Sequence, residues 1–183
     1  MNTTHILFIH GGGDDGYEAD SKLADSLQKN LGNTYKITFP RMLAPDFDSA
    51  ESWPKKINEA ITAQQPAFLV GHSFGASNIL QYLVRYGTPQ SVQGIFLVAP
   101  PFWGSDSDWD YEEYALPSDF ADKLSRTTPL FLYQCRDDEI VKIVHLDRYA
   151  KAMPWATVRK LDRGGHQMGD DLSVVAKDIL AIK

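Results

Sequence analysis

The chain has 183 residues and a formal net charge of −6, from 18 Lys and Arg against 24 Asp and Glu. A hydrophobic content of 43% excludes a mainly disordered chain, and a single cysteine excludes a scaffold of intrachain disulfides. We expect one globular domain, residues 1–183, that does not bind nucleic acid, since such binding requires a basic surface.

Targeting signals are not visible in the sequence. No apolar run reaches the roughly 18 residues that span a bilayer, and the N-terminus lacks the basic segment of a signal peptide. We therefore expect a cytoplasmic protein that does not bind membranes. The sequence indicates no oligomeric state.

Strand-like apolar runs alternate with helical patterns along the chain. In chain order they predict strand 5–10, helix 17–31, strand 35–39, helix 52–62, strand 67–71, helix 76–86, strands 94–99 and 130–135, helix 144–152, strand 157–161 and helix 172–182. Several of these strands are apolar on both faces, which is typical of a parallel sheet covered on both sides by helices. The alternation predicts a three-layer α/β domain.

Residues 100–117 interrupt the alternation with a long aromatic and acidic stretch. Such a connection is either a small lid or substrate loop, with Trp103 and Trp109 as candidate substrate-binding residues, or a solvated loop anchored by its aromatics. Its acidic residues favour neutral or cationic substrates over anionic ones, because like charges repel. These acids are Asp106, Asp108, Asp110, Glu112 and Glu113.

Gly71-His72-Ser73-Phe74-Gly75 fits the pattern G-x-S-x-G between a predicted strand and a predicted helix. This setting is typical of a sharp turn that projects a nucleophilic serine hydroxyl, with small residues where the two backbones approach closely. The alternative is a tight strand-to-helix turn with an incidental serine.

A serine nucleophile needs a general base, which follows it in the chain order serine, acid, histidine. Only His145 and His166 lie well beyond Ser73. His145 falls in a helical pattern, where a partly buried structural histidine is expected. His166 follows two glycines after the last strand, at the end of the sheet where ligands bind in α/β folds. We expect His166 to be the base.

The acid that orients the base should follow strand 130–135, where Asp137 and Asp138 are both found. Periodicity does not choose between them, and either could be a solvated carboxylate or a partner of Arg136. An oxyanion also needs two backbone N–H donors. One is expected from Phe74, and the other from the glycine-rich loop 10–13.

Two other functions compete with hydrolysis. Residues 11–16 satisfy the dinucleotide-binding pattern G-x-G-x-x-G, but Asp14 and Asp15 would repel a pyrophosphate, and no acid ends the second strand to hold a ribose. The second alternative is a non-catalytic protein of the same fold that docks a partner through residues 102–114. No group of His, Cys, Asp and Glu has the spacing of a metal site.

The chain resembles the α/β-hydrolase superfamily, and within it the short, nearly capless serine hydrolases of the retinoblastoma-binding-protein-9-like and related bacterial type. The resemblance covers almost the whole chain and rests on His10-Gly11-Gly12-Gly13, Gly71–Gly75, Asp138-Glu139-Ile140-Val141 and Gly165-His166.

This resemblance implies a six-stranded sheet in the order 2-1-3-4-5-6. In the family the acid is followed by two residues and then Val, which singles out Asp138 over Asp137, and the second oxyanion donor corresponds to Gly12. The chain departs from the family pattern at Lys142, where Pro is usual, and at Cys135, where many members have Gly.

The expected activity is cleavage of a carboxylic ester or related acyl bond in a small-molecule substrate. Ser73, His166 and Asp138 would act as nucleophile, base and orienting acid, and the N–H groups of Gly12 and Phe74 would hold the oxyanion. No metal or organic cofactor is expected.

Overall fold

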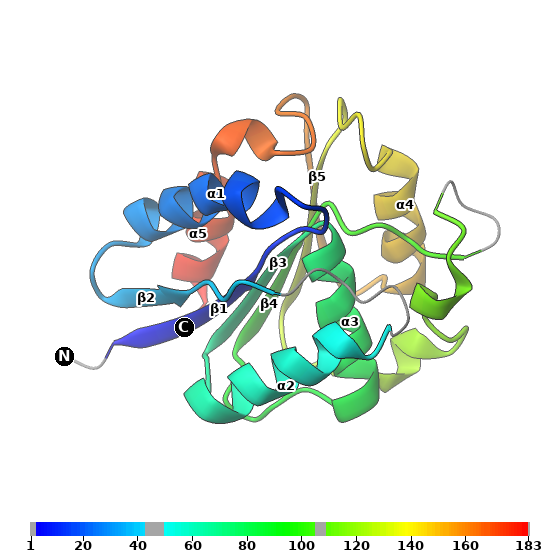
Figure 1. The fold of residues 1–183 in the computed structure, drawn as a ribbon, viewed down its shortest axis with the longest axis horizontal. Helices are drawn as coiled ribbons and strands as arrows, with labels where there is room; N and C mark the ends of the chain where they lie inside the picture. The colour runs from blue at the N-terminus through cyan, green and yellow to red at the C-terminus, as the bar shows by residue number, and fades with distance from the viewer. Residues whose placement is uncertain (1–2, 43–49, 105–108, 183) are drawn as a thin grey trace.

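The computed structural model describes residues 3–42, 50–104 and 109–182, and it contains one six-stranded sheet in the order β2-β1-β3-β4-β5-β6 (Figure 1). All neighbouring strands are parallel. The strands are β1 (Thr4–Ile9), β2 (Tyr35–Thr38), β3 (Phe68–His72), β4 (Gly94–Val98), β5 (Leu130–Cys135) and β6 (Thr157–Leu161). The α/β architecture and the strand order are both confirmed.

Five α-helices and three short 3-10 helices connect the strands in the described residues. They are α1 (Gly16–Leu31), α2 (Ser52–Gln64), α3 (Phe74–Tyr86), η1 (Glu112–Tyr114), η2 (Phe120–Lys123), α4 (Ile143–Ala152), η3 (Met168–Asp170) and α5 (Ser173–Ala181). The predicted α-helices and strands are all found, with ends shifted by two residues at most. Helix α3 begins two residues earlier than predicted, so its first residue follows Ser73 directly.

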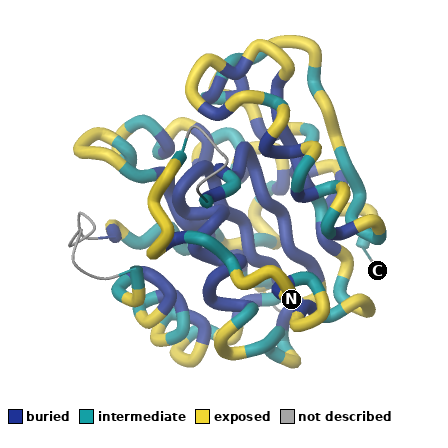
Figure 2. The backbone as a smooth tube through the Cα atoms, turned by 90° about the vertical axis from the view of Figure 1, so that its right-hand side faces the viewer, coloured by how far each residue is buried: buried dark blue, intermediate teal, exposed yellow. Residues whose placement is uncertain are grey.

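Two hydrophobic cores form because alternate strand residues face opposite sides of the sheet. Leu7 and Ile9 of β1 pack in the core on the side of α2, α3 and α4. Ile6 and Phe8 pack in the core on the side of α1 and α5. Figure 2 shows the buried strands in the middle of the molecule and the exposed residues on its outer helices and loops. Both faces of the sheet are covered, as the doubly apolar strands predict.

The segment 100–117 packs against α3 through its aromatic residues. Trp103 and Tyr114 are buried, and the Trp103 indole N–H donates to the Ser77 hydroxyl at 3.1 Å. The Gln81 amide donates to the Tyr114 carbonyl at 2.6 Å. The described part of the segment is therefore anchored on the body of the domain. Asp106 and Asp108, two of its acids, lie outside the described residues.

Within residues 3–42, 50–104 and 109–182, no helix is long and apolar enough to cross a membrane.

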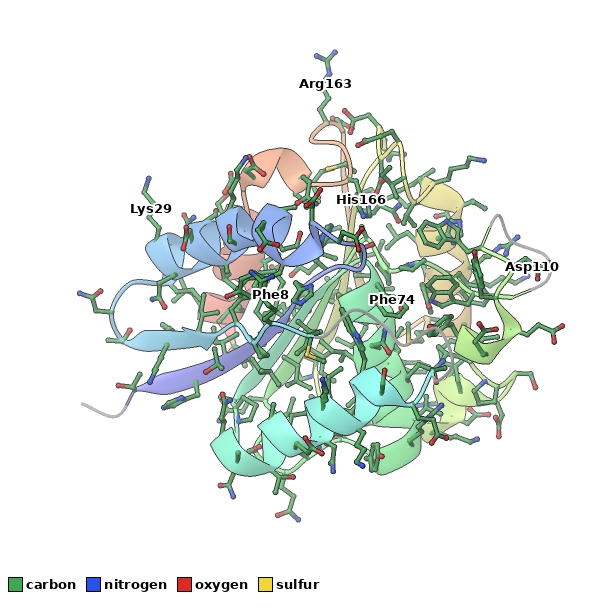
Figure 3. The ribbon with its side chains drawn as sticks, viewed as in Figure 1. Phe8, Lys29, Phe74, Asp110, Arg163 and His166 are labelled. Carbon is green, nitrogen blue, oxygen red and sulfur yellow. The ribbon has the colours of Figure 1, made fainter. Side chains whose placement is uncertain are left out.

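In Figure 3 the charged side chains of Lys29, Asp110 and Arg163 point away from the body of the molecule. His166 and Phe74 lie instead at the carboxyl end of the sheet. That end holds the loops after β1, β3, β5 and β6, which supply the predicted site residues.

Candidate active site

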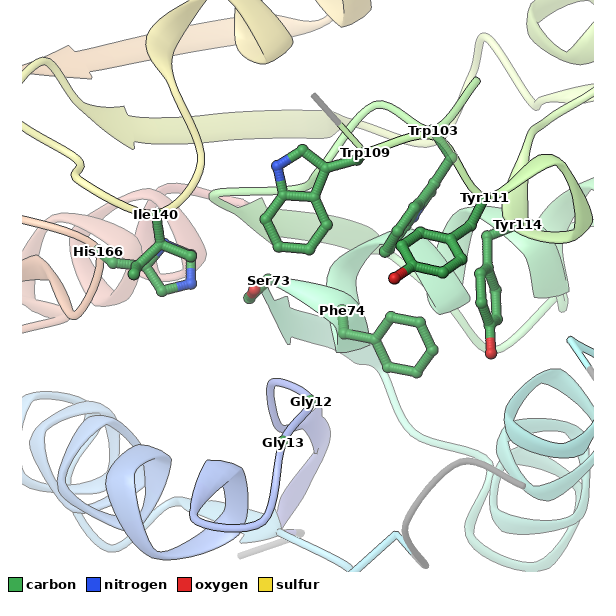
Figure 4. A pocket seen from close by; sticks show the side chains of 10 residues that line it. All are labelled: Gly12, Gly13, Ser73, Phe74, Trp103, Trp109, Tyr111, Tyr114, Ile140 and His166. Carbon is green, nitrogen blue, oxygen red and sulfur yellow. The ribbon is translucent and has the colours of Figure 1, made fainter. Parts of the chain in front are cut away.

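A cavity of about 400 Å³ lies at the carboxyl end of the sheet (Figure 4). It lies at the ends of the adjacent strands β1 and β3, whose following helices α1 and α3 cover opposite faces of the sheet. This is where ligands bind in open α/β sheets. Six of the predicted residues line it, although they come from four distant parts of the chain. The described lining residues are Gly12, Gly13, Ser73, Phe74, Trp103, Trp109, Tyr111, Tyr114, Ile140 and His166.

Ser73 sits in a strained turn between β3 and α3, with φ 51° and ψ −121°. A non-glycine residue adopts such a backbone only where its surroundings enforce it. A Cβ on Gly71 would lie 2.7 Å from the Ala76 Cα, and one on Gly75 would lie 2.3 Å from the His10 carbonyl oxygen. The two glycines therefore permit the close approach that the turn requires, as the sequence pattern predicts.

Asp138 and His166 are in contact and buried. Nδ1 of His166 lies 3.0 Å from one carboxylate oxygen of Asp138 and 3.1 Å from the other. Burial would raise the pKa of Asp138, but the hydrogen bond and charge of His166 and the N–H groups of Val141 and Ile140 hold it below its ordinary value. In Figure 4 the His166 ring lies beside Ser73 with a nitrogen turned toward it.

The loop after β1 is fixed by His10. The His10 Nδ1–H donates to the Gly11 carbonyl at 2.6 Å, and its Nε2 accepts the Met42 N–H at 2.9 Å. Burial lowers the pKa of His10, so this ring stays neutral. Because the N–H of a trans peptide points opposite to its C=O, the bond to Gly11 directs the Gly12 N–H away from His10. A Cβ on Gly12 would lie 3.2 Å from the Phe74 Cβ, so the two expected oxyanion donors are neighbours.

The family model described as Serine hydrolase matches residues 13–171. The chain belongs to the serine hydrolase family. This family confirms the resemblance drawn from the sequence.

Solved structures similar to this serine hydrolase have the α/β-hydrolase fold. The ydeN gene product from B. subtilis has a TM-score of 0.73 at 18% identity, covering 98% of both chains. The esterase domain of a Rhodothermus marinus protein has a TM-score of 0.69 at 20% identity, covering 97% of this chain and 84% of that one. A thioesterase domain from the curacin biosynthetic pathway has a TM-score of 0.70 at 16% identity, covering 97% and 91%. A comparison with curated protein sequences gave no match.

Asp137, the other candidate acid of this serine hydrolase, holds the backbone of the histidine loop. Its carboxylate oxygens accept the N–H of Gly165 at 2.9 Å and of Gly164 at 3.3 Å. Arg136 pairs with Asp162 at 3.5 Å. Asp137 is exposed to solvent, but it also supports the two glycines that precede His166, a role that the sequence did not reveal.

His145 lies in α4 and is 2% exposed, so it is more deeply buried than its helical pattern suggested. Its Nδ1 accepts the Phe102 N–H at 2.9 Å. The burial arises because the segment 100–117 packs over α4. His145 thus fixes that segment and is not one of the described cavity-lining residues.

A second carboxylate–imidazole pair, Asp20 and His72, was missed by sequence reasoning. Asp20 lies on the buried face of α1 with Leu23 and Leu27, at spacings of three and seven residues. An acid at an apolar-face position is a visible signal, since an unpaired buried carboxylate is strongly unfavourable. Across the described parts of the chain, no three His, Cys, Asp or Glu residues are grouped as they would be in a metal site.

Proposed function

We propose that this serine hydrolase cleaves carboxylic esters of small, neutral acyl groups through Ser73, His166 and Asp138. The observation that carries the proposal is geometric. A strained serine and a histidine held by a buried carboxylate line the same cavity. Nucleophile, base and orienting acid are the three groups that acyl transfer requires.

The reaction follows from these positions. The Ser73 hydroxyl attacks the ester carbonyl and His166 takes its proton, while the Gly12 and Phe74 N–H groups stabilise the oxyanion. When the intermediate collapses, His166 returns the proton to the leaving alcohol and an acyl-enzyme remains. Water, deprotonated by His166, then attacks the acyl-enzyme, and the acid leaves as Ser73 regains its proton. Asp138 stabilises the imidazolium in both steps. The scheme needs no metal or organic cofactor.

The cavity wall supports the substrate class. It is largely aromatic, and the Trp103 and Trp109 rings meet edge to face at 5.1 Å. Asp110, Glu112 and Glu113 are exposed and do not belong to the described lining, so the described acids give no support to a preference for cations. A wall of this kind favours apolar acyl groups that fit about 400 Å³.

Covalent labelling with a fluorophosphonate tests the nucleophile. The wild-type protein should label once, at Ser73, and Ser73→Ala should not label and should lose at least about a thousandfold in kcat/KM. The matched control is Ser77→Ala, which should still label at Ser73, because the Ser77 hydroxyl donates to the Phe74 carbonyl and accepts the Trp103 indole N–H. A folded wild-type protein that never labels would support the partner-binding alternative instead.

A series of p-nitrophenyl esters with increasing acyl length, beside matched thioester and peptide substrates, tests the substrate class. We expect kcat/KM to rise with apolar acyl length until the cavity is full, and to fall for acyl groups that carry a charge. Trp109→Ala should reduce this length dependence. Equal activity on charged and neutral acyl groups would contradict the proposed class.

A further inference from the structure

Asp20 and His72 form a buried pair behind the nucleophile, outside the proposed triad. His72 is the last residue of β3 and immediately precedes Ser73, whereas Asp20 comes from α1. His72 Nδ1 lies 2.8 and 2.9 Å from the two Asp20 carboxylate oxygens. Its Nε2 lies 2.9 Å from the backbone carbonyl oxygen of His166.

Both ring nitrogens of His72 therefore face oxygen acceptors. A backbone carbonyl can only accept a hydrogen bond, so Nε2 must carry a proton. An ionised carboxylate can also only accept, so Nδ1 must carry one as well. Asp20 further accepts the Gly11 N–H at 2.7 Å and a bond from the Gln167 side chain, and these donors favour its ionised form.

We propose that His72 is a doubly protonated imidazolium in the folded enzyme, and that it acts as a positioning residue for the catalytic centre. This inference rests on the proposed function, and it assigns a permanent cation to the residue immediately before the proposed nucleophile, Ser73. The alternative is a neutral pair, in which the proton sits on Asp20 and His72 donates only to His166.

The pair connects three parts of the site. Asp20 holds the loop that carries Gly12 by accepting the Gly11 N–H. His72 holds the backbone carbonyl of His166 through Nε2, whereas Asp138 binds the ring. The two imidazole rings lie 4.7 Å apart. A neutral His72 could donate to only one of its two acceptors, so loss of its proton would release either Asp20 or the His166 carbonyl.

Three groups with charge or titratable protons face His72 in the described structure. Asp20 lies in contact, the His166 ring packs beside it, and the Asp138 charge lies beyond that ring. Burial lowers the pKa of His72, but the charge and hydrogen bond of Asp20 outweigh burial and raise it above the ordinary value. The direction of this shift favours the charged form.

The protonation state can be observed directly with protein labelled with ¹⁵N in its histidine rings. At neutral pH, His72 should show two ring N–H signals protected from exchange with solvent. His10 is the internal control and should show one, since its Nε2 accepts the Met42 N–H. A single ring N–H on His72 would overturn the proposal. This measurement does not depend on activity, so it is independent of whether the proposed hydrolysis is correct.

Asp20→Asn tests the positioning role. The amide oxygen can still accept hydrogen bonds, but the charge that favours the imidazolium is gone. We expect kcat to fall about tenfold or more with KM nearly unchanged, and the alkaline limb of the kcat profile to move about one pH unit lower or more. The matched control is Asp178→Asn, which removes a buried carboxylate that binds Arg159 and Tyr133, neither of which lines the cavity.

The control variant should keep both the wild-type kcat and its alkaline limb. An alkaline limb that is unchanged in folded Asp20→Asn protein would exclude His72 as the group that titrates. If Asp20→Asn does not fold, the ring N–H count of the wild-type protein decides the question alone.

Discussion

Asp137 and Asp138 are adjacent carboxylates that support the loop of His166 in different ways. Asp138 binds the imidazole ring and is buried, so it lies where an imidazolium would form in the proposed reaction. Asp137 binds the Gly164 and Gly165 N–H groups, so it acts on the loop and not on the ring. The ring of His166 and the glycines that precede it are thus held by separate acids.

Replacing each acid with asparagine separates these roles. Asp138→Asn should lower kcat about ten-thousandfold, because an amide neither fixes the reactive tautomer nor stabilises the imidazolium. Asp137→Asn should cost about tenfold or less, since it weakens one or two exposed hydrogen bonds. Steady-state kinetics on a p-nitrophenyl ester measures both. Similar losses in the two variants would show that Asp138 is not the orienting acid.

Cys135 illustrates how burial suppresses reactivity. Burial, followed by the charges of Asp137, Asp138 and Glu139, raises the pKa of the Cys135 thiol to about 11. The nucleophilic thiolate is therefore scarce at neutral pH. We expect the native protein to resist iodoacetamide under conditions that fully alkylate the urea-unfolded chain, as measured by intact mass. Rapid alkylation of the native protein would show that the end of β5 opens.

At the scale of elements, the turn from β3 to α3 is held by backbone packing. Gly75 lies against the carbonyl oxygens of His10 and Ile9, so the first turn of α3 touches the end of β1 directly. This contact brings the loop after β1 next to Ser73. The two expected oxyanion donors are neighbours because these elements meet without side chains between them.

Gly75→Ala should therefore destabilise the fold strongly. Its Cβ would lie 2.3 Å and 2.4 Å from backbone oxygens that cannot move independently, and overpacking of this kind costs about 3 kcal/mol or more. Gly87→Ala is the control, because φ +78° strains an alanine there by about 1 to 2 kcal/mol but nothing lies within 4 Å. Urea unfolding measures both free energies. Gly87→Ala should still label at Ser73, and equal stability of the two variants would contradict the close packing.

The elements themselves were predictable because their signals are local. The apolar runs and helical spacings lie within single segments. The G-x-S-x-G pattern at residues 71–75 is also local, because it includes both glycines that the strand-to-helix turn requires. The roles of Asp20, Asp137 and His145 were not predictable, because their partners are 52, 28 and 43 residues away in sequence. Only the three-dimensional fold brings such groups together. The choice of Asp138 likewise needed a family pattern, since neither length nor periodicity separates two adjacent acids.

At the scale of the whole molecule, three buried carboxylates among the described residues are each paired with a basic side chain. Asp138 pairs with His166, Asp20 with His72, and Asp178 with Arg159. The pKa of each carboxyl would be raised by burial, but its partner lowers it below the ordinary value. The folded state therefore binds fewer protons than the unfolded chain at acid pH, and more at alkaline pH through His72. The free energy of unfolding therefore decreases toward both acid and alkaline pH.

We expect the free energy of unfolding to be highest at weakly acid to neutral pH. A carboxyl with a lowered pKa stabilises the fold above its unfolded value, about 4, and this contribution is lost as pH falls through the folded value. An imidazole with a raised pKa stabilises the fold below about 6.5, and that contribution is lost as pH rises through its folded value. Urea unfolding across the pH range measures both limbs.

Two variants assign these limbs to particular pairs. Asp178→Asn should flatten the acid limb alone, because Arg159 does not titrate in this range. Asp20→Asn should flatten both limbs, because Asp20 loses its own titration and His72 loses the charge that raises its pKa. The lowered pKa of Asp20 and the raised pKa of His72 arise from one ion pair. The contribution of this pair to the free energy of unfolding is therefore counted once. An alkaline limb as steep in Asp20→Asn as in the wild-type protein would mean that a group other than His72 controls stability above neutral pH.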